Sequence, residues 1–334
     1  MKYQSVKQTA QKWGISPTMV RRYCLQGRIP KAVLGETGWK IPENARKPGN
    51  ENQTANTCLE LRPLAKKLVR QKKKKSFHGL YDYVQINLTY SSCRMASNRL
   101  TRKQVEQLFR KGKVADMFEP IKASDVIEAM NHCSCIDYVL DHLAEPLSVR
   151  FIKKLHELLM KGSVDATMMR VVPGEFRTVQ TIRREKFFLP AEQISKALQA
   201  LLAEYEKTRS HSLDEILEFH VHFERIFPFE DGNGRIGRLI LFKECLRHGL
   251  MPFILDDKRR GRYLDGIRHW DEESQILQTV VEEAQARFAA QETLQDHMEQ
   301  ERRLAPAYHH TFKCNYRVSE NHRFYPYIWP YIRP

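Results

Sequence analysis

Apolar side chains recur at three- and four-residue spacing through most of the chain after residue 81. This spacing places them on one side of a helix, as in the run Leu239, Ile240, Phe242 and Leu246. The same pattern returns in successive segments that are separated by breaks in the period. It predicts helices over residues 81–94, 101–110, 120–142, 148–161, 190–206, 212–226, 234–248, 257–269 and 272–303.

Two stretches depart from this helical period. Residues 171–189 hold Val171-Val172-Pro173-Gly174 and then a β-rich segment, which together predict a hairpin. Residues 305–334 hold four prolines and many aromatic side chains without a period, so we expect an irregular tail within a C-terminal region at 291–334. The expected fold class is mainly α, a helical bundle that carries one β-hairpin.

Residues 1–48 follow a different pattern, with two short helices and several short strands. Ser5 is a good N-cap for a helix over 5–13, Gly14 breaks that helix, and Pro17 suits the first position of a second helix. Short apolar runs between residues 27 and 42 predict the strands of a small wing. Two helices joined by a glycine turn are typical of a helix-turn-helix.

This N-terminal pattern resembles the MerR/excisionase-like winged helix-turn-helix, a DNA-binding module. The resemblance implies that the second helix enters the major groove, where Thr18, Arg21 and Arg22 would meet bases or phosphates. Arg28 and Lys40 would contact the DNA backbone. The alternative is a winged helix that serves only packing or protein interaction.

The charge of the chain agrees with an anionic partner at this end. The 334 residues carry a formal net charge of +15, but residues 1–79 alone hold 18 lysines and arginines against 4 glutamates, a net of +14. Residues 49–79 begin with little apolar content and end in lysine runs, so we expect a basic linker there. Its lysines would add phosphate contacts without base specificity.

Composition excludes several classes of protein. With 42% hydrophobic and 28% charged residues the chain is neither disordered nor fibrous. It has no apolar run long enough to span a membrane, and its first residues lack the apolar core of a signal peptide, so we expect a cytoplasmic protein. The seven cysteines are odd in number and scattered, which favours reduced thiols over disulfides.

The most informative segment is FPFEDGNGRIGR, which runs from Phe227 to Arg238. Pro228 ends the preceding helix, and Gly232-Asn233-Gly234 make a tight turn before the next helix. Backbone N–H groups at such a helix start bind phosphate oxygens. The turn is therefore a candidate phosphate cradle.

Charged side chains around this turn fit the same chemistry. Arg235 and Arg238 lie three residues apart on one helix face and can clamp one polyphosphate, while Asp231 is placed to hold Mg²⁺. A packing role suits Phe229, which would fill the core, and Asn233, which would tie the turn together. It suits the two arginines less well, because unpaired they would leave a concentrated charge.

The segment resembles the signature of the Fic family, H-[PX]-F-x-[DE]-G-N-G-R-x-x-R, at every defining position except the first. The resemblance covers about residues 81–290, and we expect the domain at 80–290. It implies a Fic-type bundle that binds ATP and Mg²⁺ and transfers AMP to a hydroxyl of a protein target. The family's hairpin flap, on which a target docks as an added strand, corresponds to the positions Gly174, Phe176, Arg177 and Phe188.

The exception is the family's catalytic histidine, whose position holds Phe227. A phenyl ring cannot take the proton of a target hydroxyl, and loss of a general base costs roughly 10²–10⁴ in rate. His220 and His222 are near in sequence but lie on the preceding helix, where structural roles suit them better. The resemblance therefore implies nucleotide binding with impaired transfer.

A second departure concerns regulation. Residues 86–98 resemble the family's inhibitory helix, in which [ST]-x-x-x-E-[GN] supplies a glutamate that pairs with the second motif arginine, here Arg238. Ser92 matches the start of that pattern, but Ala96 stands at the glutamate and Ser97 at the following position. We therefore expect the inhibitory glutamate to be missing together with the general base.

Two functions follow from these patterns. One is a DNA-associated Fic pseudoenzyme that binds a nucleotide as a sensor or scaffold. The other is an AMP-transferase that is active in a parent form and altered at Phe227 and Ala96. The resemblance also makes Tyr263 a candidate contact for the adenine base, with a solvated helix start as the alternative. The apolar side of residues 272–303 would pack on the core or pair two copies into a homodimer.

Overall fold

The computed structural model describes residues 3–25, 29, 32–35, 38–45, 47, 62–75, 78–114, 121–163, 171–178, 182–183, 186–187 and 189–312. The chain divides into two compact units, Met1–Thr57 and Cys58–Pro334. Each unit has a hydrophobic core of its own.

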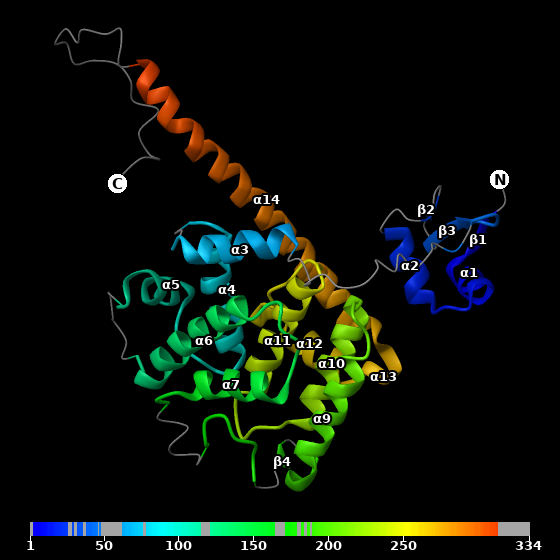
Figure 1. Ribbon diagram of the computed structural model, residues 1–334, viewed down its shortest axis with the longest axis horizontal. Helices are drawn as coiled ribbons and strands as arrows, with labels where there is room; N and C mark the ends of the chain where they lie inside the picture. Colours follow the sequence, from blue (N-terminus) through cyan, green and yellow to red (C-terminus); the bar gives the residue numbers. More distant parts are fainter. Residues whose placement is uncertain are drawn as a thin grey trace. The chain divides into compact units, whose positions relative to one another are not determined.

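The first unit combines two helices with a three-stranded antiparallel sheet (Figure 1). The strand order is β1-β3-β2, with Gln4 opposite Ile41 and Leu34 opposite Trp39. The elements are β1 (Tyr3–Ser5), α1 (Val6–Trp13), α2 (Pro17–Leu25), β2 (Val33–Gly35) and β3 (Gly38–Pro42).

Local sequence signals set the helices of this unit. The Ser5 side chain accepts a hydrogen bond from the Gln8 N–H at 3.3 Å, and the Gln8 side chain accepts one from the Ser5 N–H at 2.9 Å, so the predicted cap is confirmed. Gly14 ends α1 in the left-handed region, with φ of 62°. Val20 and Ile41 are fully buried between the helices and the sheet.

The second unit is a helical bundle with one short hairpin. Its helices lie within a few residues of the predicted ranges, because apolar period and capping are local signals. The elements are α3 (Pro63–Lys73), α4 (Leu80–Met95), α5 (Arg102–Lys111), α6 (Ala123–Asp141), α7 (Val149–Met160), β4 (Ile182–Arg183), β5 (Lys186–Phe187), η1 (Ala191–Gln193), α9 (Ile194–Tyr205), α10 (Leu213–Ile226), α11 (Asn233–Arg247), η2 (Asp257–Arg259), α12 (Arg260–Arg268), α13 (Trp270–Glu273) and α14 (Gln275–Phe312).

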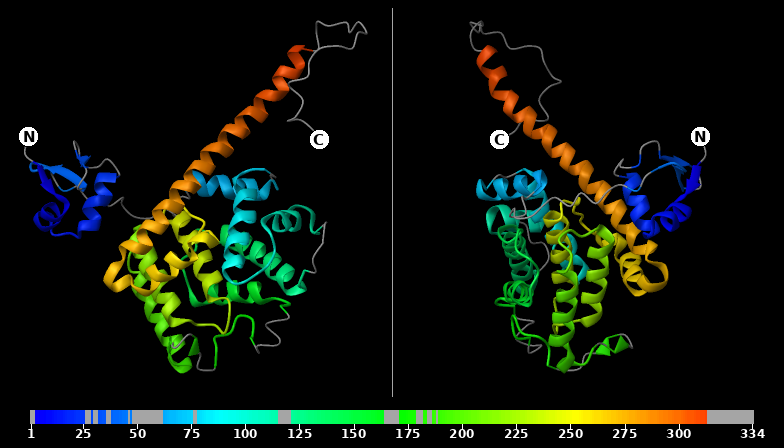
Figure 2. Two further views of the ribbon diagram at one scale, coloured as in Figure 1. Left: turned by 180° about the vertical axis from the view of Figure 1, so that it is seen from behind. Right: turned by 45° about the vertical axis from the view of Figure 1, so that its right-hand side comes forward.

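Helix α11 is at the centre of this bundle (Figure 2). It is buried almost all round, including the side chains of Lys243 and Glu244, and it packs on α4, α6, α7 and α10. A helix buried on every side needs partners for its charged groups. The two ends of α11 obtain them differently.

Two expectations about the ends of this unit differ from the structure. Residues 63–73, predicted as part of a basic linker, form helix α3, because Ala65 and Leu68 bury an apolar stripe in the core of the bundle. Residues 305–312, predicted as irregular, continue helix α14. The remaining tail, 313–334, lies outside the described residues.

Within the described part of the chain, no helix is both long and apolar enough to cross a membrane.

Candidate functional site

The turn between α10 and α11 has the geometry of a helix-start anion cradle. Phe227 ends α10 in the left-handed region, with φ of 50°, and Gly232 caps α11 with φ of 84°. A Cβ on Gly232 would lie 2.6 Å from Met160 Cε, the far end of a flexible side chain that can move aside, so it is the positive φ that favours glycine here. The first N–H groups of α11 have no acceptor within the helix.

Packing holds this turn in place. The Asn233 amide donates to the Phe229 carbonyl at 2.7 Å and accepts from the Phe229 N–H at 2.9 Å. The Phe229 ring is fully buried and stacks on His156 with centroids 3.9 Å apart. The predicted structural roles of Asn233 and Phe229 are confirmed.

Three of the positions predicted for the flap anchor the turn. Arg177 is 3% exposed and donates from Nε to the Phe227 carbonyl at 2.8 Å, and its N–H donates to the Pro228 carbonyl at 2.9 Å. The Gly174 N–H donates to His156 Nδ1 at 2.9 Å. Phe176 packs against Phe229 with centroids 5.7 Å apart.

These contacts change the interpretation of the hairpin segment. The guanidinium of Arg177 is hydrogen-bonded to the motif backbone, so this side chain anchors the turn. Docking of a target on the hairpin as an added strand stays a prediction. The predicted hairpin itself is present as β4 paired with β5, Ile182 opposite Phe187. Phe188, the fourth predicted docking residue, lies outside the described residues.

Arg235 lies between two carboxylates. Its guanidinium is 6% exposed and forms ion pairs with Glu128 of α6 and with Asp231 of the turn. Burial by itself lowers the pKa of Arg235, but these two negative charges raise it, so the group stays charged. Glu128 is held in turn by the Asn98 amide, which donates to it at 2.7 Å.

Arg238 binds the helix that resembles the inhibitory helix. Its Nε donates to Ser92 Oγ at 3.0 Å and its Nη2 donates to the Ser92 carbonyl at 2.9 Å. Ala96 ends α4 and is exposed, and Ser97 adopts φ of 78°, a conformation that suits the glycine or asparagine of the family pattern. The second motif arginine therefore pairs with a hydroxyl and a carbonyl rather than with a carboxylate on this helix.

A cavity of about 210 Å³ opens beside Arg235. Basic and acidic side chains balance on its wall, and Ala96 borders it. The charged residues that line the cavity are Arg99, Lys122, Asp125, Glu128, Asp231 and Arg235.

Phe227 supplies no proton acceptor to this site. Its side chain is 9% exposed. His220 does not replace the missing histidine, because burial lowers its pKa to about 3 and its Nε2 lies 2.6 Å from the Tyr263 hydroxyl inside the core. His222 lies on α10 with an ion-pair distance of 3.9 Å to Glu218. His220 has the structural role expected of it, whereas the structural role expected of the half-exposed His222 stays a prediction.

The predicted adenine contact at Tyr263 is wrong. The ring is 2% exposed and packs in the core of the bundle, so it has no surface to offer a base. The helix over 257–269 was predicted correctly, but its period alone does not say which face meets the bundle.

A buried acid lies behind the two motif arginines. Glu224 of α10 has one carboxyl oxygen, Oε1, that is buried and has no hydrogen-bond partner among the described residues. Burial raises the pKa of Glu224 to about 7, and the charge of Arg238 offsets only part of that shift. A Cβ on Gly237 would lie 2.8 Å from this oxygen, so Gly237 permits the close approach.

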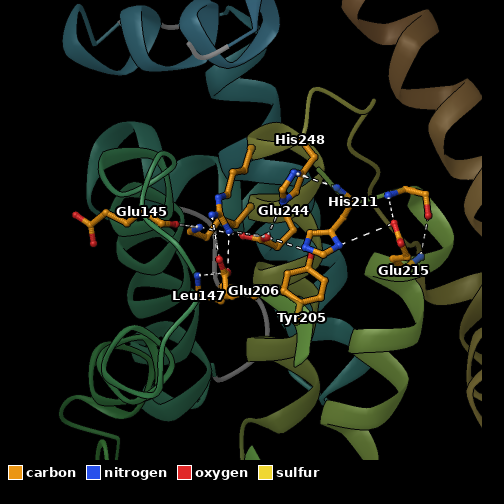
Figure 3. Close-up of polar contacts among 11 residues, drawn as sticks. Glu145, Leu147, Tyr205, Glu206, His211, Glu215, Glu244 and His248 are labelled. Atoms are coloured by element: carbon orange, nitrogen blue, oxygen red, sulfur yellow. Dashed lines mark hydrogen bonds and ion pairs between the residues drawn. The ribbon is translucent and has the colours of Figure 1, made fainter. Parts of the chain in front are cut away.

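The far end of α11 carries a second polar network (Figure 3). Glu244 is fully buried and accepts hydrogen bonds from Lys243 at 2.9 Å and from the Tyr205 hydroxyl at 3.1 Å, with His248 at 3.1 Å. Lys243 also donates to the Glu145 carbonyl at 2.6 Å. This network ties α9, α11 and the loop before α7 together.

Three of the five residues predicted to contact DNA have described side chains in the first unit. Thr18 and Arg21 lie on α2, where Arg21 is exposed, and Lys40 is exposed on β3. The side chain of Arg22 and the whole of Arg28 lie outside the described residues.

Sequence reasoning missed Glu128 and Asn98, and it named Arg177 only as a flap position and not as an anchor of the turn. Asn98 follows Ala96 by two positions, so its place after the inhibitory-like helix was a usable signal. Glu128 and Arg177 are separated from their partners in the motif by about a hundred and about fifty residues, and no local pattern predicts such pairs. Asp231, predicted to hold Mg²⁺, forms an ion pair with Arg235. Among the described residues no group of three or more metal-ligating side chains occurs.

Comparisons with known proteins agree with the motif. Residues 146–245 match the Fic/DOC family model. Over 131 residues the chain is 30% identical to a probable protein adenylyltransferase of Aquifex aeolicus, a match that spans 38% of each protein's length.

Solved structures show the same fold. A Fic domain containing signaling protein from Bacteroides thetaiotaomicron is similar with a TM-score of 0.56 and 20% identity, over 71% of this chain and 92% of that one. A fragment of Fic-1 from C. elegans is similar with a TM-score of 0.53 and 17% identity, over 67% of this chain and 64% of that one.

Proposed function

Because residues 146–245 form a domain of the Fic/DOC family, we propose that the second unit binds a nucleotide in the manner of protein adenylyltransferases but transfers AMP poorly. The observation that carries this proposal is the start of α11. There, Gly232 adopts a positive φ that favours glycine, and Arg235 borders a cavity.

The residues present suit phosphates better than a whole nucleotide. A cavity of about 210 Å³ is smaller than the roughly 300–1,000 Å³ of ligand pockets, so it takes the phosphate part. The N–H groups of α11, Arg235 and Arg238 would hold that part. Phosphate oxygens would compete with Glu128 and Asp231 for Arg235, and this competition would lower the affinity for the nucleotide.

Mg²⁺ would be held at Asp231, where its charge would offset both the phosphates and the neighbouring carboxylates. ATP would supply the reactive phosphate. The protein supplies orientation through its two arginines and the rigid turn tied by Asn233.

Transfer is slow in this proposal because no group at position 227 can accept the proton of a target hydroxyl. Ala96 removes the inhibitory carboxylate as well, so the site has neither the base nor the brake of the family pattern. The alternative is a parent AMP-transferase that carries histidine at position 227. The exposed Ala96 beside the cavity suits both accounts.

Binding of a non-hydrolysable ATP analogue to the full chain tests the proposal. We expect saturable binding by calorimetry with Mg²⁺ present, and weaker binding when Mg²⁺ is removed. The exposed Arg268, which pairs with Asp265 away from the cavity, provides a control as Arg268→Ala. Absence of any binding would overturn the proposal.

For the first unit we propose DNA binding through α2, supported by exposed Arg21 and Lys40 and by the basic charge of residues 1–79. Its affinity should fall steeply with salt, because phosphate contacts release counterions. Fluorescence anisotropy with duplex DNA at several salt concentrations measures this, with Arg21→Ala as the variant. Salt-independent or absent binding would contradict it.

A further inference from the structure

The carboxylate of Glu128 faces Arg235 and is fixed from behind. Glu128 lies on α6, and its side chain, which is 15% exposed, lines the cavity beside Arg235. Its Oε1 forms the ion pair with Arg235, and its Oε2 accepts a hydrogen bond from the Asn98 amide at 2.7 Å. One oxygen therefore occupies the arginine while the other is held in place.

Asn98 is itself held by the end of α4. Its side chain is 3% exposed, donates to the Asp125 carbonyl at 2.9 Å and accepts from the Leu100 N–H at 3.0 Å. The Asn98 N–H donates to the Cys93 carbonyl at 3.1 Å, which closes the last turn of the helix. The helix that resembles the inhibitory helix thus positions a carboxylate at the site through Asn98, although its own glutamate position holds Ala96.

The three acids that line this cavity differ in how their charge is compensated. Asp125 accepts from the Arg99 N–H at 3.3 Å, and its carboxylate lies 3.8 Å from Arg99 Nε. Asp231 would be neutralised by Mg²⁺ in the function proposed above. Among the described residues, the ion pair of Glu128 is with Arg235. Glu128 is therefore the acid that still competes for Arg235 after Mg²⁺ has bound.

The two motif arginines differ in what a phosphate must displace. Arg238 donates to the hydroxyl and the carbonyl of Ser92, which are neutral groups. Arg235 donates to a carboxylate, and hydrogen bonds between a guanidinium and an anion are among the stronger ones. A phosphate that binds Arg235 gives up part of that interaction and also approaches the negative charge of Glu128. The first motif arginine is therefore the one that an internal acid masks.

We propose that Glu128 is an autoinhibitory carboxylate that acts on the first motif arginine, and that the end of α4 holds it there through Asn98. The inference rests on nucleotide binding at the start of α11, which it refines by naming the group that limits the affinity. The masked residue is Arg235, whereas in the family pattern a glutamate at position 96 would act on Arg238. Saturating nucleotide overcomes this inhibition, because Glu128 lowers the affinity and removes no group that transfer needs.

A purely structural Glu128 predicts the opposite sign. If the carboxylate only kept Arg235 buried and oriented, its loss would leave the guanidinium less well placed, and nucleotide affinity would fall or stay unchanged. Removal of an autoinhibitory Glu128 instead frees a donor of Arg235, so the affinity rises. The sign of the change in affinity separates the two roles.

Calorimetry of the full chain with a non-hydrolysable ATP analogue and Mg²⁺ measures this sign. We expect Glu128→Gln to bind about tenfold to a hundredfold more tightly than the wild type, the range of one charge-assisted hydrogen bond. Glu128→Met, which removes both acceptors at similar volume, should also bind more tightly. Asp125→Asn is the matched control, because it removes the same charge from the same cavity wall without releasing Arg235, and its gain should be clearly smaller.

Asn98→Ala tests the connection to α4. Glu128 keeps its charge in this variant but loses the hydrogen bond that fixes it, so we expect a gain in affinity that is smaller than that of Glu128→Gln. Thermal unfolding of each variant without nucleotide shows whether it is folded, which separates changes in affinity from misfolding. An unchanged affinity in a folded Asn98→Ala variant would overturn the role given to the end of α4.

The possible outcomes distinguish failure of this inference from failure of the proposed function. Binding by the wild type, with an unchanged or weaker affinity in Glu128→Gln, overturns the inference and leaves nucleotide binding intact. Equal gains from Glu128→Gln and Asp125→Asn overturn it too, since they indicate general repulsion of the phosphates. Binding by Glu128→Gln but not by the wild type supports it, and absence of binding by both proteins overturns both proposals.

Discussion

The two ends of α11 bury charge in opposite ways. At the far end, Glu244 accepts hydrogen bonds from Lys243 and Tyr205, so its charge is fully partnered. At the motif end, Glu224 faces Arg238 and Gly237 with one carboxyl oxygen unbonded among the described residues. The difference teaches that burial alone does not identify a functional group, because a buried charge can be fully partnered within the protein.

The pKa values of these two glutamates express the contrast. Burial would raise the pKa of Glu244, but hydrogen bonds from His248 and Lys243 and nearby cationic charge lower it to about 2. Burial raises the pKa of Glu224 to about 7 because no hydrogen bond opposes it. The carboxylate of Glu244 at the far end has hydrogen-bond partners on neighbouring elements. One carboxyl oxygen of Glu224 at the motif end has none among the described residues.

The largest expected effect comes from restoring a base at the motif end. Phe227→His should raise AMP transfer by about 10²–10⁴, the usual contribution of a general base. Incorporation of label from ATP into the protein itself or an added target measures it, with Phe227→Leu as the control. Ala96 already removes the inhibitory carboxylate, so a silent Phe227→His variant would refute the catalytic interpretation of the site.

Breaking the network at the far end should cost stability instead. Glu244→Gln leaves Lys243 buried without its counter-charge, and we expect a loss of about 3–5 kcal/mol in the free energy of unfolding. Glu224→Gln should cost little or stabilise, because it removes an unbonded acid. Urea denaturation of the pair compares them, and equal losses would contradict the distinction drawn between the two ends.

Removing a motif arginine should weaken ligand binding by a smaller factor. Arg235→Ala takes away charge-assisted hydrogen bonds to phosphate that are worth about 1.5–3 kcal/mol, or about tenfold to a hundredfold in affinity. Calorimetry with an ATP analogue measures the change. An affinity that rises would contradict the role given to Arg235 in holding phosphate. It would mean that Glu128 and Asp231, left without their partner, do not repel the phosphates.

The last prediction concerns pH. The folded protein holds the Glu224 proton more tightly than the unfolded chain, so stability is fully present below the ordinary pKa of about 4.5 and is lost as pH rises to about 7. Glu244 behaves oppositely and contributes stability that is lost as pH falls from about 4.5 towards 2. Unfolding of the wild type and Glu224→Gln from pH 4.5 to 8 tests this, and a variant with an unchanged slope would contradict it.

Sequence signals predicted the framework of the second unit well, because they act over a few residues. Apolar period placed the helices, the Asn233 and Phe229 roles followed from a tight turn, and the Fic-type motif located the site. Helix α3 was missed because its lysine runs conceal the stripe formed by Ala65 and Leu68. A charged surface and a buried stripe coexist on one helix, and composition averages over both.

The sequence by itself determined the helical fold, the glycine turn before α11, and the absence of a base at position 227. Only the tertiary structure decided which groups surround that turn. It pairs Arg235 with Glu128 and Arg238 with Ser92, buries Tyr263, and commits Arg177 to the motif backbone. The physical reason is range: caps and periods are properties of neighbouring residues, whereas a charge finds its partner through the packing of helices that are distant in sequence.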